Sequence, residues 1–217
     1  MKSKQNLIPD NQIGEVLEGL EKMHPEAACA LEHRDRFQLL VAVMLSAQTT
    51  DVSVNKVTPA LFERFPDAAS MAEADPLEVQ EIIRTIGLYK NKSKNAVAMA
   101  KKLSEEYGGE VPGDFKELVK LPGVGRKTAN VVLAEGFGEA RIAVDTHVFR
   151  VANRIGLTDG KDPTEVEEGL MERLPEEQWI RAHHLIIFHG RKVCHARKPD
   201  CENCGIRDIC MYCNEQQ

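Results

Sequence analysis

Aromatic residues make up only 5% of this 217-residue chain, with a single Trp. Strands favour aromatic and β-branched residues in period-two alternation. The sequence has no clean alternation of that kind and no Asn-Gly hairpin signal, so we expect an all-helical protein. Long hydrophobic runs are also missing. The longest, residues 37–45, is broken by Gln38 and is far shorter than the ~20 residues that span a bilayer. It predicts a buried helix.

The N-terminus lacks the continuous apolar segment of a signal peptide, so we expect a cytoplasmic protein with no membrane partner. The net charge of -6 is weak evidence against a nucleic-acid partner. The charges are segregated, however. Residues 84–102 carry six basic and no acidic side chains, residues 181–198 carry five and none, and residues 162–177 carry seven acids against one Arg. Such segregation can build a basic, phosphate-binding face. On charge alone, solvated helix faces without a partner are an equal alternative.

Short turns containing Gly or Pro separate the helical stretches, at residues 65–67, 107–109 and 136–138. Asp145 is expected to cap a helix that runs to Arg154 and is terminated by Gly156. A further helix is predicted over residues 175–189, with Gly190 as its stop signal.

The segment Leu-Pro-Gly-Val-Gly-Arg-Lys-Thr, residues 121–128, predicts a glycine turn that leads directly into a helix. Arg126 and Lys127 would then lie in the first helical turn, where the helix dipole disfavours cations by about 0.3–1 kcal/mol each. The unpaired N–H groups there form an anion site, and a bound phosphate would offset the two charges. We therefore expect a helix-hairpin-helix, with helices over about 114–120 and from about 126. A plain inter-helix turn is the alternative.

Lys127 and Asp145 are the candidate catalytic residues. A helix N-terminus and partial desolvation both favour the neutral form of a lysine, and a neutral amine can attack a sugar carbon and form a Schiff base. Asp145 is ordinarily an N-cap, but a rigidly held carboxylate could also assist the amine and stabilise a developing sugar cation. His147, two residues later, has the pattern of an ordinary polar helical residue.

Five of the six cysteines lie in the last 24 residues, namely Cys194, Cys201, Cys204, Cys210 and Cys213. In a reducing cytoplasm this density indicates metal binding rather than disulfides. The first four give C-x6-C-x2-C-x5-C, which suits an iron–sulfur cluster. The last four give two C-x2-C pairs, as in zinc sites, but their five-residue separation is short against the usual roughly 12–20. Spacing favours iron–sulfur and leaves zinc and free thiols open. Cys29 is expected to be a small core residue.

Five segments, in this order, resemble the endonuclease III family of DNA glycosylases and abasic-site lyases: residues 43–59, 83–96, 121–132 and 144–157, and the cysteine spacing. The resemblance covers about residues 20–210. It implies an all-α, two-lobed helix-hairpin-helix DNA glycosylase fold with a C-terminal [4Fe-4S] cluster loop. One lobe, residues 29–139, would contain the hairpin. The other, residues 1–28 plus 140–217, would contain the cluster.

The resemblance also implies roles for individual residues. Lys127 would displace a damaged base at C1′, Asp145 would assist, and β-elimination would then cut the strand. The expected substrate is double-stranded DNA containing oxidised or ring-saturated pyrimidines or abasic sites, bound by a monomer at the nucleoid. The family's four cluster ligands match Cys194, Cys201, Cys204 and Cys210, and leave Cys213 outside the pattern.

DNA contacts follow in the same way. The family inserts side chains at positions matching Gln48 and Leu88 into the space left by a flipped base. The other expected contacts are Gly123, Val124, Gly125, Arg126, Thr128, His147, Arg197 and Lys198. From the residues alone, a core Leu88 and a turn-capping Gln48 remain the alternatives.

Two other functions stay open. Adenine-mismatch glycosylases are similar, but they lack a lysine at the Lys127 position, carry a different dipeptide after Asp145, and have a long C-terminal extension. A non-catalytic helix-hairpin-helix DNA-binding module would need neither Lys127 nor Asp145.

Overall fold

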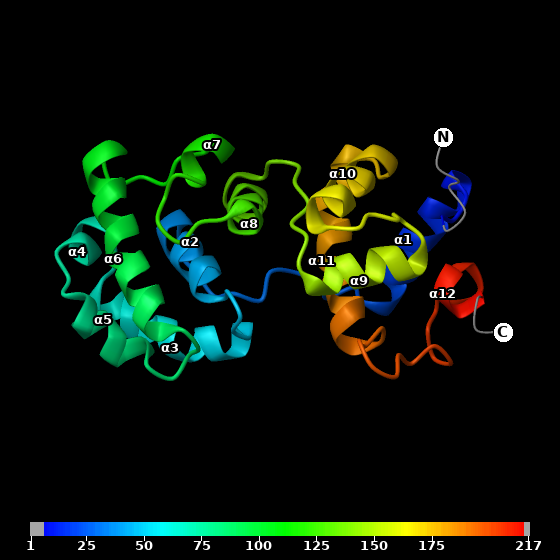
Figure 1. Ribbon diagram of the computed structural model, residues 1–217, viewed down its shortest axis with the longest axis horizontal. Helices are drawn as coiled ribbons and strands as arrows, with labels where there is room; N and C mark the ends of the chain where they lie inside the picture. The colour runs from blue at the N-terminus through cyan, green and yellow to red at the C-terminus, as the bar shows by residue number, and fades with distance from the viewer. Residues whose placement is uncertain (1–6, 215–217) are drawn as a thin grey trace. The chain divides into compact units, whose positions relative to one another are not determined.

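The computed structural model describes residues 7–214, and over that range every regular element is a helix (Figure 1). The all-helical prediction is confirmed. Contacts divide the chain into two compact units: unit 1, formed by residues 1–29 and 140–217, and unit 2, formed by residues 30–139. Among the described residues, no helix is long and apolar enough to cross a membrane.

Unit 2 is built around α2, whose residues Phe37 to Leu45 are all buried, as the apolar run predicted. Asp35 caps this helix by accepting a 2.8 Å hydrogen bond from the N–H of Gln38. α2 packs against α3, α6 and α8. The helices of unit 2 are α2 (Arg36–Leu45), α3 (Asp51–Arg64), α4 (Ala68–Ala72), α5 (Pro76–Ile83), α6 (Tyr89–Glu106), α7 (Phe115–Leu118) and α8 (Arg126–Phe137).

Unit 1 has its own core, in which α9 packs against α10 and α11, and α1 packs against α11. α9 begins after Asp145 and ends at Gly156, which adopts a φ of 91°; both predicted ends are confirmed. The elements of unit 1 are η1 (Asp10–Gln12), α1 (Ile13–Met23), α9 (Thr146–Ile155), α10 (Pro163–Arg173), η2 (Glu176–Gln178), α11 (Trp179–Lys192), η3 (Arg207–Ile209) and α12 (Met211–Asn214).

Two glycines that the sequence suggested as helix ends or turns lie inside helices. α11 continues through Gly190 to Lys192, so the predicted stop is wrong. A Cβ on Gly190 would lie 3.0 Å from Val151 and 3.1 Å from His147, so this glycine permits close packing of α11 on α9. Gly136 likewise lies within α8, where a Cβ would come within 3.1 Å of Leu39. Both residues serve helix packing, a tertiary requirement that local sequence does not reveal.

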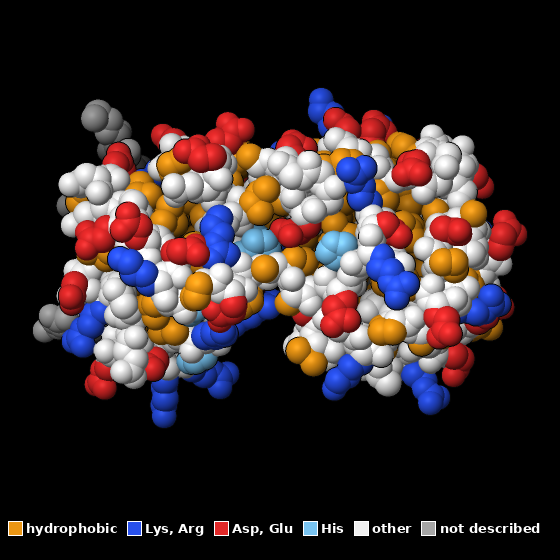
Figure 2. All heavy atoms as spheres, turned by 180° about the vertical axis from the view of Figure 1, so that it is seen from behind, with side chains coloured by type: hydrophobic (Ala, Val, Ile, Leu, Met, Phe, Trp, Pro, Cys, Tyr) orange, Lys and Arg blue, Asp and Glu red, His pale blue; other side chains and the backbone are white. Residues whose placement is uncertain are grey.

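Cys29 is half-buried rather than a core residue, so that expectation is wrong. The charged side chains also form no continuous basic area on the face drawn in Figure 2, where Lys and Arg alternate with Asp and Glu over both units. Any phosphate-binding surface on that face must therefore be local.

Candidate functional site

The segment between α7 and α8 forms a tight hairpin on the core of unit 2. The N–H of Leu121 donates to the carbonyl of Leu118 at 3.0 Å, and that of Val124 donates to Leu121 at 3.1 Å. Gly123 has a φ of 79°, and a Cβ there would lie 3.0 Å from Asn95 and 3.1 Å from Met44. Glycine is thus required both for conformation and for space. The helix-hairpin-helix is present, with a first helix shorter than predicted.

α8 starts without a side-chain cap. Its N-cap is Gly125, whose carbonyl accepts from Ala129 at 2.9 Å. Within the described part of the chain, the N–H groups of Gly125, Lys127 and Thr128 have no hydrogen-bond acceptor. The N–H of Val124 is used inside the turn and its side chain is buried. Val124, an expected DNA contact, therefore offers no free N–H group to a phosphate and instead fixes the shape of the hairpin.

The two cations of the first turn have different surroundings. The Arg126 guanidinium lies 5.6 Å from the centre of the Phe115 ring, so a cation–π contact offsets part of its unfavourable position. Lys127 is exposed, and its amine has no hydrogen-bond or ion-pair partner among the described residues. The expectation that the Lys127 amine is partly desolvated is therefore wrong for the protein without DNA. Lys127 is accessible, which a nucleophile for a macromolecular substrate requires.

Asp145, in unit 1, is a rigid N-cap of α9. Its Oδ1 accepts hydrogen bonds from the N–H groups of His147 and Val148, both at 2.8 Å. Its Oδ2 accepts none from any residue that the structure describes. The carboxylate thus caps the helix with one oxygen and keeps the other for a different partner.

His147 is held in place by Arg150, which the sequence did not single out. Nη2 of Arg150 lies 3.2 Å from Nδ1 of His147 and donates to the carbonyls of Gly190 and Cys194, both at 3.0 Å. Arg150 therefore ties α9 to the end of α11 and to the first cysteine of the C-terminal segment. Only the fold brings these carbonyls together, so no local pattern could have identified this role.

Gln48 and Leu88 share an unusual geometry within unit 2. Their φ angles are 53° and 59°, in the left-handed region that non-glycine residues adopt at a cost of about 1–3 kcal/mol. Leu88 is 53% exposed, so the alternative of a core residue is wrong. Gln48 is also exposed, and its side chain bonds to none of the described residues, so it caps no turn there. A Cβ on Gly87 would lie 3.7 Å from the Gln48 carbonyl, so the two turns are neighbours.

The C-terminal cysteines are drawn together in unit 1. Burial is the main cause that raises the pKa of Cys204 to about 11, and the thiols of Cys210, Cys194 and Cys201 act in the same direction, which shows that these four are neighbours. Buried thiols resist ionisation, and a bound metal centre is what makes them thiolates. The four thiols therefore fit a cubane cluster, in which each thiolate binds a different iron.

Other observations bear on the cluster segment. Among the described residues, no three His, Cys, Asp or Glu side chains are grouped as the ligands of one metal ion would be. Cys213 is buried, and burial raises its pKa, with hydrogen bonding to Cys201 and Cys210 acting in the same direction. Cys213 is thus a neighbour of the four thiols rather than a remote residue.

Arg197 and Lys198 are exposed on the loop between the first two of these cysteines. Arg154 supports the loop from α9, donating to the carbonyls of His195 at 2.7 Å and Ala196 at 3.1 Å. Its Nη1 also lies 3.5 Å from Sγ of Cys194. The basic loop is therefore fixed to a helix as well as to its cysteines.

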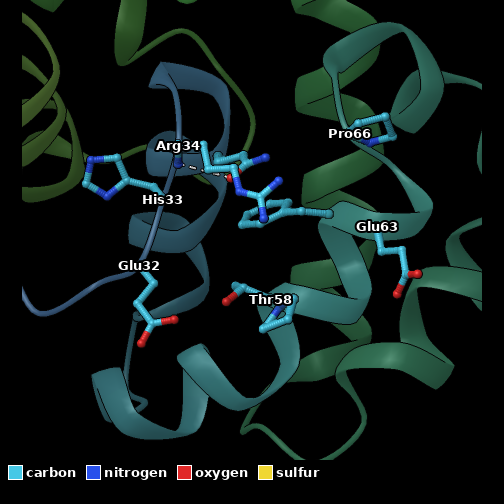
Figure 3. Close-up of a pocket in the computed structure, with 9 residues that line it drawn as sticks. Glu32, His33, Arg34, Thr58, Glu63 and Pro66 are labelled. Carbon is cyan, nitrogen blue, oxygen red and sulfur yellow. Dashed lines mark hydrogen bonds between the residues drawn. The ribbon is translucent and has the colours of Figure 1, made fainter.

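None of these candidate residues lines the cavity of about 570 Å³ in unit 2. It is lined by Glu32, His33, Arg34, Gln38, Thr58, Pro59, Phe62, Glu63 and Pro66 (Figure 3). The candidate residues instead lie at exposed turns and helix ends. A surface of that kind suits a large polymer better than a small molecule.

Comparison with known proteins identifies the class. Residues 41–176 match the HhH-GPD superfamily of base excision DNA repair proteins, and residues 194–210 match the iron–sulfur binding domain of endonuclease III. The chain belongs to this superfamily of repair enzymes.

Individual relatives narrow the assignment to the endonuclease III family, as the motifs predicted. The chain is 50% identical to an endonuclease III of Synechocystis sp. over 90% of both sequences, and 48% identical to that of Escherichia coli over 91% of this chain and 94% of the relative. A trapped endonuclease III–DNA covalent intermediate, 45% identical, superposes with a TM-score of 0.91 over 97% of this chain and 99% of that one. The cofactor is accordingly a [4Fe-4S] cluster.

Proposed function

We propose that this protein removes oxidised or ring-saturated pyrimidines from double-stranded DNA and cuts the strand through a Schiff base on Lys127. Membership of the endonuclease III family makes the chain a DNA glycosylase and abasic-site lyase of base excision repair. The lesion class and the residue roles are the proposal. The observation that carries it is Lys127, an exposed amine with no partner among residues 7–214, in the first turn of a helix that lacks a side-chain cap.

The chemistry begins when Lys127 loses a proton and its nitrogen attacks C1′ of a flipped nucleotide. The bond from C1′ to the base breaks, and its electron pair leaves with the base, which takes up a proton. The sugar ring opens to a protonated Schiff base on Nζ. Loss of a C2′ proton then expels the 3′ phosphate by β-elimination, and water releases the lysine.

Asp145 assists the first step. The free Oδ2 accepts the lysine proton and stabilises positive charge on the sugar, while Oδ1 stays bonded to the α9 amides. Because the cap fixes the carboxylate, little reorganisation is needed when charge develops.

Phosphate binding uses the uncapped end of α8. The N–H groups of Gly125 and Thr128 and the charge of Arg126 attract one phosphate, with Gly123 allowing a close approach. Arg197 and Lys198 contact a second stretch of backbone, and His147 contributes a further polar contact. Gln48 and Leu88 enter the duplex where the base has left, and their exposure on neighbouring turns supports this role.

The [4Fe-4S] cluster is held by Cys194, Cys201, Cys204 and Cys210, and Cys213 is not a ligand. The match to the iron–sulfur domain ends at residue 210, which supports this set. When bound, the cluster supplies four metal–thiolate bonds that fix the loop carrying Arg197 and Lys198. We further propose that the protein acts as a monomer at the nucleoid.

Replacing Lys127 by Gln tests the proposal. We expect the variant to bind abasic DNA nearly normally but to lose base excision and the covalent adduct that borohydride traps. The matched control is Lys116→Gln, which removes an exposed charge from α7 of the same hairpin. Persistent trapping in Lys127→Gln would overturn the assignment. Turnover on oligonucleotides that each carry one lesion, with A·G mismatches included, tests the substrate class against adenine removal.

A further inference from the structure

Lys92 is a buried lysine that the chemistry above does not use. It lies in the first turn of α6, and only 4% of its surface is exposed. Its Nζ donates a 2.7 Å hydrogen bond to Oγ1 of Thr49, and its main-chain N–H donates to the carbonyl of Leu88 at 3.0 Å. Burial lowers the pKa of its ammonium group. One residue thus bonds to both of the turns that carry Gln48 and Leu88.

A buried ammonium at this position is costly, because an apolar side chain of the same length would fill the space without desolvating a charge. One local feature reduces the cost. The hydroxyl of Thr49 accepts a 2.7 Å hydrogen bond from Nζ, which replaces part of the hydration that the ammonium group loses. The hydrogen bond to Thr49 adds directionality that apolar packing does not supply. The lysine therefore specifies where the Thr49 turn lies relative to α6.

The conformations of the Gln48 and Leu88 turns must be held in place by surrounding contacts. Both have a non-glycine residue in the left-handed region, and such conformations persist only where surrounding contacts over-determine them. Gly87 packs directly on the other turn, since a Cβ there would lie 3.7 Å from the Gln48 carbonyl and 3.8 Å from Oγ1 of Thr49. A single glycine contact does not fix direction, whereas the bond from Lys92 to Thr49 does.

We propose that Lys92 is a positioning residue that locks the Gln48 and Leu88 turns into one rigid unit, so that both side chains enter the duplex together. The inference rests on the proposed function, in which these two side chains fill the space of the flipped base. If the turns move independently, each inserts alone and the flipped state loses part of its support. Excision should then slow most on substrates in which the enzyme must still extrude the base from a paired duplex.

The experiment compares Lys92→Met, Thr49→Val and the double variant with the unmodified protein. Single-turnover excision is measured on dihydrouracil opposite guanine in a fully paired duplex, and on the same lesion inside a three-nucleotide mismatched bubble. Melting temperature is measured for each protein. Lys56→Met, which removes an exposed lysine from α3 of the same unit, is the matched control. Leu88→Ala is the reference for loss of insertion.

For Lys92→Met we expect about tenfold slower excision in the paired duplex, equivalent to about 1.4 kcal/mol, since one charge-assisted hydrogen bond is lost. Excision in the bubble should change by less than about twofold, within the usual error of independent effects. The double variant is decisive because removing both partners restores apolar packing. It should regain the melting temperature of the unmodified protein and still be slow on the paired duplex.

Recovery of paired-duplex excision in the double variant, or equal losses on both substrates, would show that Lys92 only stabilises the fold and would overturn the inference. Failure of the proposed function looks different. In that case the unmodified protein would show no excision and no borohydride adduct, or Leu88→Ala would behave normally on the paired duplex.

Discussion

The first turns of α8 and α9 differ in how their free backbone N–H groups are satisfied. α9 begins with a carboxylate that accepts two of its free amides, both at 2.8 Å. α8 begins with a glycine, which has no side chain to accept a hydrogen bond from these amides, and two cations follow it. A capped end is the stable arrangement, worth about 0.5–2 kcal/mol over an alanine. The start of α8 lacks that stabilisation, and in the proposed function its N–H donors bind a phosphate instead.

The difference indicates where stability has been exchanged for function. In α8 the free N–H groups would be satisfied from outside, since a phosphate would accept hydrogen bonds from them and offset the charge of Arg126. In α9 the carboxylate of Asp145 accepts hydrogen bonds from two of the corresponding N–H groups through Oδ1, while its Oδ2 accepts none from residues 7–214. In the proposed function, the two helix starts supply an exposed nucleophile, Lys127, and a rigidly held carboxylate, Asp145. Substitutions that make one start resemble the other should separate these roles.

The largest effect is expected at Asp145. Asn is also a good N-cap, so Asp145→Asn should melt within about 0.5 kcal/mol of the unmodified protein. Base excision should fall by about 10²–10⁴-fold because the proton acceptor is lost. Asp145→Ala should lose both the cap and the activity. Circular dichroism melting and single-turnover excision measure the two effects; an Asn variant that unfolds would show that capping is the main role of the carboxylate.

The next effect concerns the cysteines beyond α9. Cys204→Ser should abolish the yellow-brown colour and the content of about four irons per chain. Cys213→Ser should keep both, although Cys213 is buried and Cys204 only half-buried. Absorbance and iron analysis of freshly purified protein check this prediction. Bleaching by Cys213→Ser, or zinc in place of iron, would show that the ligand set has been chosen wrongly.

A smaller effect is expected when α8 is given the cap of α9. Gly125 has a φ of −98°, and nothing lies within 4 Å of a Cβ built there, so Gly125→Asp fits without strain. It should raise stability by about 0.3 kcal/mol and weaken DNA binding by about tenfold through repulsion of phosphate.

Gly125→Asn is the control, because it caps without adding charge and should weaken binding less. Calorimetric melting and fluorescence anisotropy measure the two quantities. Unchanged DNA affinity in Gly125→Asp would place the phosphate elsewhere.

The same two helix starts show what sequence can and cannot predict. Both ends of α9 could be predicted because their signals are local: an N-cap carboxylate at the start and, eleven residues later, a glycine at the end. The hairpin before α8 could be predicted in the same way, from the glycines of residues 121–128. The prediction that a helix ends at Gly190 was wrong because the role of this glycine depends on Val151 and His147, about forty residues away.

Burial was harder to predict than helix position. Leu88 is apolar yet exposed, whereas Lys92 is charged yet buried. Both depend on how two turns from distant parts of the chain meet, and no spacing rule records that. The roles of Arg150 and Arg154 were missed for the same reason, since each bonds to carbonyls some forty residues away.

The central claim is that the amine of Lys127 forms the covalent link to DNA. Incubation with an abasic duplex under borohydride, followed by protease digestion and mass spectrometry of the adduct, tests it directly. We expect one modified peptide, with the deoxyribose remnant on Nζ of Lys127. An adduct on another lysine or on the N-terminal amine, or no adduct while the DNA is still cut, would contradict it.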